Sequence, residues 1–339
     1  MNRFVHALVP PLLIPVAVVV ATLAANTPAQ GQLTSTNLAP VICRLTPQAS
    51  LTRGCFPPCL CPVVFFGPVR GTMILTPIPT SPTATIFDYR VDDVNWLAAI
   101  NNSNEWRITG TGILRRVGAP SIGAQRLELD LRINDESVAH FDSGWHLPSV
   151  PFPSLDLGVS LNGGVCFDTV IRVAAAPVPT SQVLRYRVTQ PSTWQTGCWP
   201  PCMCPLQMPR PVTGPFTLVP IPAINPTPTA PIEYAVVNVV FNVLSPSTTV
   251  TDVSIRYRGY GFYRRNLPSP TSTTPNHQRL FLDLRRVGLN TTAGYERFDS
   301  GIVPTTMPFP VIDILISKNG MVCLDTVFDL RASPITTTP

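Results

Sequence analysis

Three cysteines lie close together in a pattern that occurs twice in this chain. Residues 54–62 have the sequence GCFPPCLCP, and residues 197–205 have the sequence GCWPPCMCP. A fourth cysteine, Cys166 or Cys323, follows an Asn-Gly pair in each half of the chain. Thiols grouped in this way form disulfides in exported proteins, or bind zinc or an iron–sulfur cluster.

Disulfides are the favoured interpretation, because Cys-x3-Cys-x-Cys lacks the Cys-x2-Cys knuckle usual for zinc. The eight candidates are Cys55, Cys59, Cys61, Cys166, Cys198, Cys202, Cys204 and Cys323. Four cysteines in each half allow three pairings. We expect Cys166 to pair with Cys59 or Cys61, and Cys323 to pair with Cys202 or Cys204, with Cys55 closing a small loop.

Cys43 aligns with Tyr186, so it is the candidate for an unpaired cysteine: a buried free thiol or an intermolecular link.

Four aspartates of the first half, each with a counterpart in the second half, are the candidate oxygen ligands for a metal. They are Asp130, Asp142, Asp156 and Asp168, matched by Asp283, Asp299, Asp313 and Asp325. Calcium prefers such oxygen ligands. However, no EF-hand loop is present, and turn hydrogen bonds or cross-strand pairs with arginine explain aspartates at these positions. We predict no metal ligands or other cofactor, and leave calcium open.

Ser143 follows Asp142 and has His140 and His146 nearby, which is the one arrangement that suggests a hydrolase. The second half keeps Asp299-Ser300-Gly301 but has Arg297 and Val303 in place of the histidines. No nucleophile elbow, phosphate loop or HExxH motif occurs. The shared residues are therefore interpreted as structural, and we predict no catalytic residues and no enzyme.

Apolar and polar residues alternate along the segments that carry these side chains. Leu127, Leu129 and Leu131 alternate with Glu128, Asp130 and Arg132, which is typical of a half-buried strand. Asn162-Gly163 and Asn319-Gly320 each predict a hairpin. Without a helical period, about eight short strands in each half indicate an antiparallel sandwich, jelly roll or barrel. The predicted fold is all-β, with two tandem homologous, disulfide-stapled domains of β-sandwich or jelly-roll-like form.

Matching segments run through both halves and predict a repeat. The pairs include 125–132 with 278–285, 141–144 with 298–301, 151–153 with 308–310, and 162–170 with 319–327. The spacing between copies grows in turn-rich stretches, as expected for insertions in loops. We assign residues 1–31 to a signal peptide, 32–176 to the first β domain and 177–339 to the second.

The N-terminus and the composition indicate an exported protein. Met1-Asn2-Arg3 precedes an apolar stretch that ends in small residues, the pattern of a cleaved signal peptide. No second long apolar segment follows, so we expect no membrane span after signal cleavage. The net charge is +5, but the arginines lie in separate strand-like stretches, which argues against nucleic-acid binding. The expected location is secreted or at the cell surface, most simply of a bacterium.

No motif identifies a specific function. The leading hypothesis is a non-catalytic extracellular or cell-surface structural or interaction protein, whose partner is an unknown extracellular protein or glycan. A carbohydrate-binding module is the first alternative, and it requires an exposed row among the five tryptophans, Trp96, Trp106, Trp145, Trp194 and Trp199. A secreted hydrolase that gathers His140, Ser143 and an acid is the second alternative.

Overall fold

The structure, a computed structural model, describes residues 39–81, 84–99, 104–118, 123–223, 230–245, 253–269, 272–288 and 294–335. These residues form β-strands and one short 3-10 helix, η1 (Thr180–Gln182), and no α-helix occurs among them. None of their helical segments has the length and apolarity needed to cross a membrane. The predicted signal peptide, residues 1–31, lies outside the described residues.

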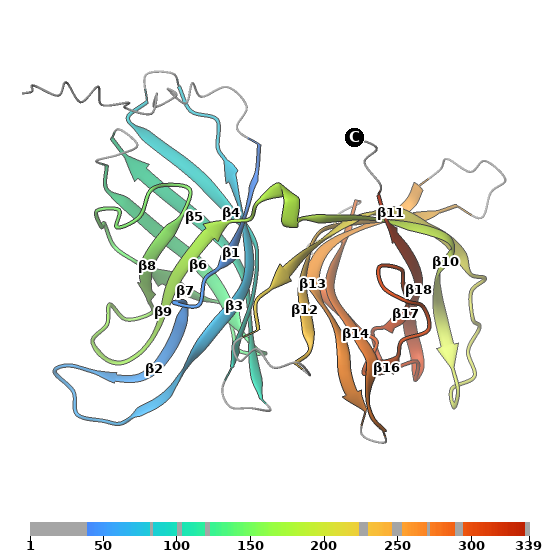
Figure 1. Cartoon of the computed structure of the whole chain (residues 1–339). Helices are drawn as coiled ribbons and strands as arrows, with labels where there is room; N and C mark the ends of the chain where they lie inside the picture. Colours follow the sequence, from blue (N-terminus) through green and yellow to red (C-terminus); the bar gives the residue numbers. More distant parts are fainter. Residues whose placement is uncertain are drawn as a thin grey trace, which may run out of the picture. The chain divides into compact units, whose positions relative to one another are not determined.

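The first sheet forms a ring of antiparallel strands that closes on itself (Figure 1). Its strands are β1 (Val41–Leu45), β2 (Ser50–Phe56), β3 (Val63–Pro77), β4 (Ile86–Ala99), β5 (Glu105–Val117), β6 (Gln125–Ile133), β7 (Ala139–Asp142), β8 (Leu155–Ser160) and β9 (Cys166–Pro177). From β2 to β9 each strand pairs with the next one in the sequence, and β9 pairs with β2. The short β1 pairs with β3 and β9.

The second sheet has the same order of pairing. Its strands are β10 (Leu184–Trp199), β11 (Arg210–Ile221), β12 (Ile232–Leu244), β13 (Val253–Ser269), β14 (Ser272–Val287), β15 (Glu296–Asp299), β16 (Val303–Pro304), β17 (Ile312–Ser317) and β18 (Cys323–Pro334). Successive strands pair around the ring, β18 returns to β10, and only the two-residue β16 stands outside it, against β14.

The predicted all-β antiparallel class is confirmed, whereas the finer prediction of a sandwich or jelly-roll form is not. A jelly roll is built from Greek-key connections between strands that are not consecutive. In both rings, consecutive strands are neighbours, which is an up-and-down barrel arrangement. The described pairings therefore support the barrel, one of the three forms left open, and give no support to the jelly roll. Alternation along a strand shows which side chains face inward, but not which strands become neighbours.

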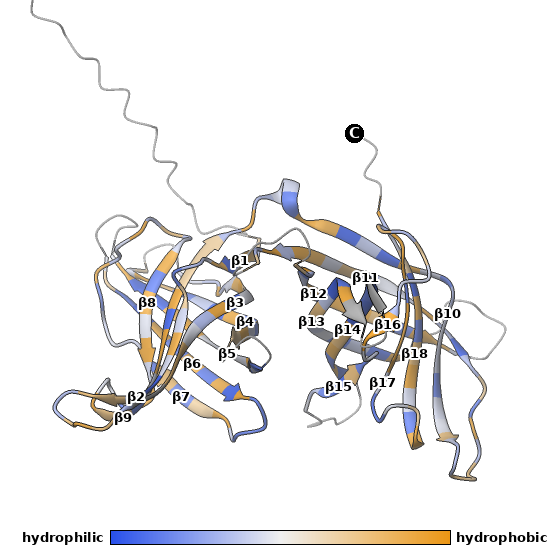
Figure 2. Ribbon diagram, turned by 60° about the horizontal axis from the view of Figure 1, so that its bottom comes forward, coloured by the Kyte–Doolittle hydropathy of each residue, from blue (hydrophilic) through white to orange (hydrophobic). Residues whose placement is uncertain are grey.

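Each ring encloses an apolar core that follows the sequence alternation. In β6, Leu127, Leu129 and Leu131 are fully buried, whereas Asp130 and Arg132 between them are exposed. Similar banding runs along most strands of both rings (Figure 2). Separate clusters of buried side chains fill the first and the second ring. Period-two burial therefore holds each sheet around its own interior.

A third apolar cluster joins the outer faces of the two sheets. It contains Leu97 of β4 together with Val219, Ile221, Ala235, Val237, Phe262 and Phe281 of β11–β14. Beside it, Arg70 and Glu105 of the first sheet and Arg264 and Glu233 of the second form a closed ring of four ion pairs, two of which run between the sheets. Arg107 of β5 also forms a buried pair with Asp283 of β14, at 2.8 Å.

Candidate functional site

The cysteines pair identically in the two sheets. Cys59 and Cys166 have a Cα–Cα separation of 4.8 Å, and Cys55 and Cys61 one of 5.2 Å. In the second sheet Cys202 pairs with Cys323 at 4.8 Å, and Cys198 with Cys204 at 5.1 Å. The sequence left two possible partners for each of Cys166 and Cys323, and in the structure these partners are Cys59 and Cys202. Each long link fastens a Pro-Pro turn to the first residue of the last strand, and four disulfide pairs indicate an oxidising compartment.

Cys43 has a different environment from the other cysteines. Its side chain is fully buried in β1, and its thiol is free. Burial raises the pKa of the thiol to about 12, so it stays protonated at neutral pH. A buried, protonated thiol is poorly reactive and cannot reach another chain without local opening. The structure therefore favours the first of the two predicted roles.

The Asp-Ser-Gly motif closes a turn in both sheets. Ser143 Oγ accepts a hydrogen bond from Leu127 N at 2.8 Å and donates to Gly144 O at 2.7 Å. Ser300 makes the same two contacts, with Leu280 N and Gly301 O. The His140 ring instead contacts Asp130 at 2.9 Å, and both side chains are exposed. The residues of the hydrolase alternative are near in sequence but do not meet as a triad.

Asp168 and Asp325 organise the two Asn-Gly hairpins. The Asp168 carboxylate is buried and accepts hydrogen bonds from four backbone N–H groups, those of residues 161, 162, 164 and 169. Asp325 accepts four bonds in the same way, from residues 318, 319, 321 and 326. These contacts satisfy a buried carboxylate without a metal.

The other repeated aspartates are held apart by separate partners. Asp142 binds Arg126, which lowers the pKa of this carboxyl group, and Asp156 binds Arg172. Asp283, the counterpart of Asp130, binds Arg107 of the first sheet. The part of the chain that the structure describes contains no group of three or more His, Cys, Asp or Glu side chains arranged to hold a metal ion. The structure does not bring the candidate calcium ligands together.

The five tryptophans do not form an exposed row. Trp96 is fully buried in the first core, and Trp106 packs against Phe65 with ring centroids 4.8 Å apart. Trp145 is 48% exposed, and Trp199 is half-buried at the end of β10. Trp194 is 5% exposed and lies in a pocket, which is the strongest candidate for a functional site.

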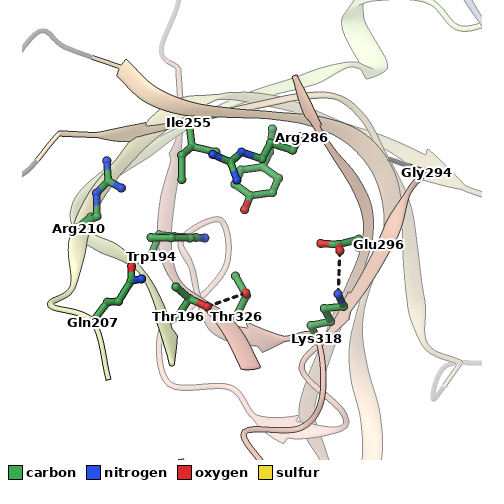
Figure 3. Close-up of a pocket in the computed structure, with 11 residues that line it drawn as sticks. Trp194, Thr196, Gln207, Arg210, Ile255, Arg286, Gly294, Glu296, Lys318 and Thr326 are labelled. Atoms are coloured by element: carbon green, nitrogen blue, oxygen red, sulfur yellow. Dashed lines mark hydrogen bonds and ion pairs between the residues drawn. The ribbon is translucent and has the colours of Figure 1, made fainter. Parts of the chain in front are cut away.

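This pocket opens at one end of the second ring and has a volume of about 510 Å³ (Figure 3). Its lining comes from strands distant in sequence: Trp194, Thr196, Gln207, Arg210, Ile255, Tyr257, Arg286, Gly294, Glu296, Lys318 and Thr326. Inward-facing positions of β10, β13 and β18 supply the floor and walls, because alternate residues of a barrel strand point to its interior. A cavity of this size suits a small molecule.

Short polar contacts fix several of the lining side chains. Arg210 donates two hydrogen bonds to Leu244 O, at 3.0 and 2.8 Å, and lies over the Trp194 ring at 5.4 Å. Glu296 and Lys318 form an ion pair at 2.7 Å. The hydroxyls of Thr196 and Thr326 are 3.2 Å apart. The pocket is therefore lined by pre-positioned donors around an aromatic wall.

Tyr257 joins the pocket to the core beneath it. Its ring packs edge-on against Phe328, with centroids 5.2 Å apart, and against Phe298 at 6.4 Å. Burial raises the pKa of the Tyr257 hydroxyl, an effect that the neighbouring Trp194, Arg286 and Arg210 oppose. The phenol stays neutral at physiological pH and can donate a hydrogen bond to a ligand.

Sequence reasoning singled out only Trp194 among these residues, as part of the carbohydrate alternative. The others were missed because six separate segments supply them. A signal was nevertheless present in the inward-facing positions. Arg210, Arg286 and Lys318 occupy register positions that hold Gly67, Ile133 and Leu161 in the first sheet. Charged residues at core-facing strand positions are uncommon without a partner or a function.

Comparison with known proteins adds no relative, since no protein-family model, curated protein or solved structure matches this chain.

Proposed function

We propose that this chain is an exported, non-catalytic binding protein that acts in the extracellular space or at the cell surface, with its ligand in the pocket of the second ring. The observation that carries the proposal is the pocket itself, about 510 Å³ in volume and walled by the buried Trp194. Four disulfide pairs and the signal-peptide pattern support export.

A binding role has more support than the two alternatives. A secreted hydrolase needs a nucleophile beside a base, whereas Ser143 and Ser300 donate to backbone carbonyl oxygens. A carbohydrate-binding module of the platform type needs exposed aromatic rings in a row, and only Trp145 among the tryptophans is exposed. We keep the extracellular protein or glycan partner as a broader proposal for the remaining surface.

Thermal unfolding in the presence of small-molecule probes tests the proposal. A ligand at about 100 times its Kd stabilises the native state by about 2.7 kcal/mol, which raises Tm by several degrees. Ile255→Trp copies Trp106 of the first sheet into the pocket and should abolish that shift. Ile302→Trp, at an exposed position outside the pocket, is the matched control and should keep it.

Two results would count against this function. An equal shift in the Ile255→Trp variant would place the ligand elsewhere. Recovery of a bound ligand as a chemically altered product, detected by mass spectrometry, would show that the protein is catalytic.

A further inference from the structure

The pocket is positively charged because of residues that only the second sheet possesses. Its lining includes three cationic side chains, Arg210, Arg286 and Lys318, and one carboxylate, Glu296. Lys318 is the only lysine in a chain whose other 23 basic residues are arginines. The strand register places the uncharged residues Gly67, Ile133 and Leu161 at the three equivalent positions of the first sheet. The charge is therefore a feature of this pocket and not of the barrel.

A buried hydrogen-bond donor points into the same space. The Trp194 side chain is 5% exposed, and its indole N–H has the Tyr257 hydroxyl beside it as an acceptor of imperfect geometry. Figure 3 shows the ring nitrogen of Trp194 directed to the centre of the pocket, with Glu296 and Lys318 on the facing wall and Arg286 above. A ligand acceptor in the pocket would complete the hydrogen bonding of this buried N–H.

We propose that the ligand is a small organic anion, whose oxyanion group is bound by Arg286, Lys318 and the Trp194 N–H. The inference rests on the proposed binding function and specifies its ligand class. Carboxylate and phosphate groups accept several charge-assisted hydrogen bonds at once, which is what converging cationic and N–H donors offer.

The remaining lining suits the body of such a molecule. Ile255 and Tyr257 present an aliphatic and an aromatic side chain on β13, and both are largely buried. Tyr257 stays protonated, because burial raises its pKa, and so adds no negative charge against the anion. Glu296 holds the Lys318 ammonium at 2.7 Å and thereby positions it on the wall of the pocket.

Calorimetric titration with three probes that share one aromatic body tests the ligand class. The probes are phenylacetate, phenylacetamide and 2-phenylethylamine, which carry a negative, neutral and positive group. Phenylacetate should bind about tenfold or more tightly than the amide, the factor that one charge-assisted hydrogen bond supplies, and the amine should bind most weakly. Because Lys318 is the only lysine, its ¹³C-dimethylated side chain gives a single lysine NMR signal, separate from that of the dimethylated α-amino group, and this signal should move with phenylacetate.

Variants separate the anion site from general binding. Arg286→Gln, Lys318→Gln and Trp194→Phe should each weaken phenylacetate binding by about tenfold and leave amide binding unchanged. Arg285→Gln is the matched control for Arg286, because neighbouring residues of a strand point to opposite faces. Lys318 is 41% exposed, so its variant should fold even if that of Arg286 does not.

Each outcome decides between the two proposals. Equal or tighter binding of the amide or the amine would overturn the anion proposal and leave the binding function standing. If none of the three probes binds and the Lys318 signal does not move, both the ligand class and the pocket function are wrong.

Discussion

The two sheets share a scaffold and differ at the end of the ring where the pocket lies. Both have the same strand order and the same cysteine pairs. At that end of the first ring, Phe65 packs on Trp106, and Arg53 lies 5.9 Å from the Trp106 ring and binds Glu136. Ile255 stands in the place of Trp106 and leaves room in the second ring. The contacts that build the scaffold are common to both sheets, and the candidate site lies where they differ.

A second difference concerns the outer faces of the sheets. Ala235, Val237 and Phe281 of the second sheet are buried against the first. The matching register positions of the first sheet hold Arg90, Asp92 and Glu128, which keep charge at its own outer face. One sheet therefore carries an apolar docking face and the other a polar face. The position matching Arg70 is Thr213, which cannot form the interface ion pair.

The largest effect should come from the shared scaffold and should be equal in the two sheets. One double variant changes both Cys59 and Cys166 to alanine, and the other changes both Cys202 and Cys323 to alanine. These variants open disulfide links that span 107 and 121 residues. The chain-entropy model gives a loss of about 4–5 kcal/mol of stability for loops of this length, against about 2 kcal/mol for the short Cys55–Cys61 loop. Guanidinium unfolding measures both. A large difference between the two long links would show that the sheets are not equivalent.

Neutralising one carboxylate on the outer face of each sheet should reduce stability by unequal amounts. Glu233→Gln leaves Arg70 and Arg264 in the interface with one carboxylate, and breaking a largely buried ion pair typically costs about 3–5 kcal/mol. Asp88→Asn changes the counterpart, whose pair with Arg115 spans 3.9 Å and is partly exposed, and should cost less than about 1 kcal/mol. Equal losses in chemical unfolding would argue that the ion-pair ring does not hold the sheets together.

Local features of this fold were predictable, and the features that depend on strand neighbours were not. Leu127, Leu129 and Leu131 show their burial in the sequence, and Asn162-Gly163 lies in the connection of the predicted hairpin, between β8 and β9. The pocket depends on which strands close the ring, because Trp194 and Lys318 are 124 positions apart in the sequence. Comparing equivalent strand positions between the halves would have exposed both differences. Outward-facing Phe281 occupies the position of Glu128, and inward-facing Lys318 occupies that of Leu161.

A gain of stability, smaller than the largest losses above, is expected from a substitution at the bulge of β4, which has an equivalent in β12. Asp93 and Asn238 occupy equivalent bulge positions with φ of 50° and 54°. Burial, and then the neighbouring Asp92, raise the pKa of Asp93 to about 6 from its usual 3.8. The native state therefore binds more protons than the unfolded chain between these values, and stability falls as pH rises from about 4 to 6.

Asp93→Asn copies the residue of the second sheet and removes that loss. The variant should be more stable than the wild type by about 3 kcal/mol at pH 7, since each pKa unit corresponds to about 1.4 kcal/mol, and unchanged near pH 3, because only the ionised carboxylate is penalised. Asn238→Asp, at an exposed position, is the control and should change stability little. Parallel stability curves for Asp93→Asn and wild type across pH 3–7 would rule out this account.

The smallest effect tests whether the Asp-Ser-Gly motif is structural in both sheets. Ser143→Ala and Ser300→Ala each remove the acceptor for one backbone N–H, that of Leu127 or Leu280. Each should reduce stability by about 1 kcal/mol, the usual net value of such a hydrogen bond, and by the same amount in either sheet. A selective role for Ser143 would instead appear as a change in ligand turnover with no loss of stability. That result would restore the hydrolase alternative, because His140 and His146 stand near Ser143 in the sequence and not near Ser300.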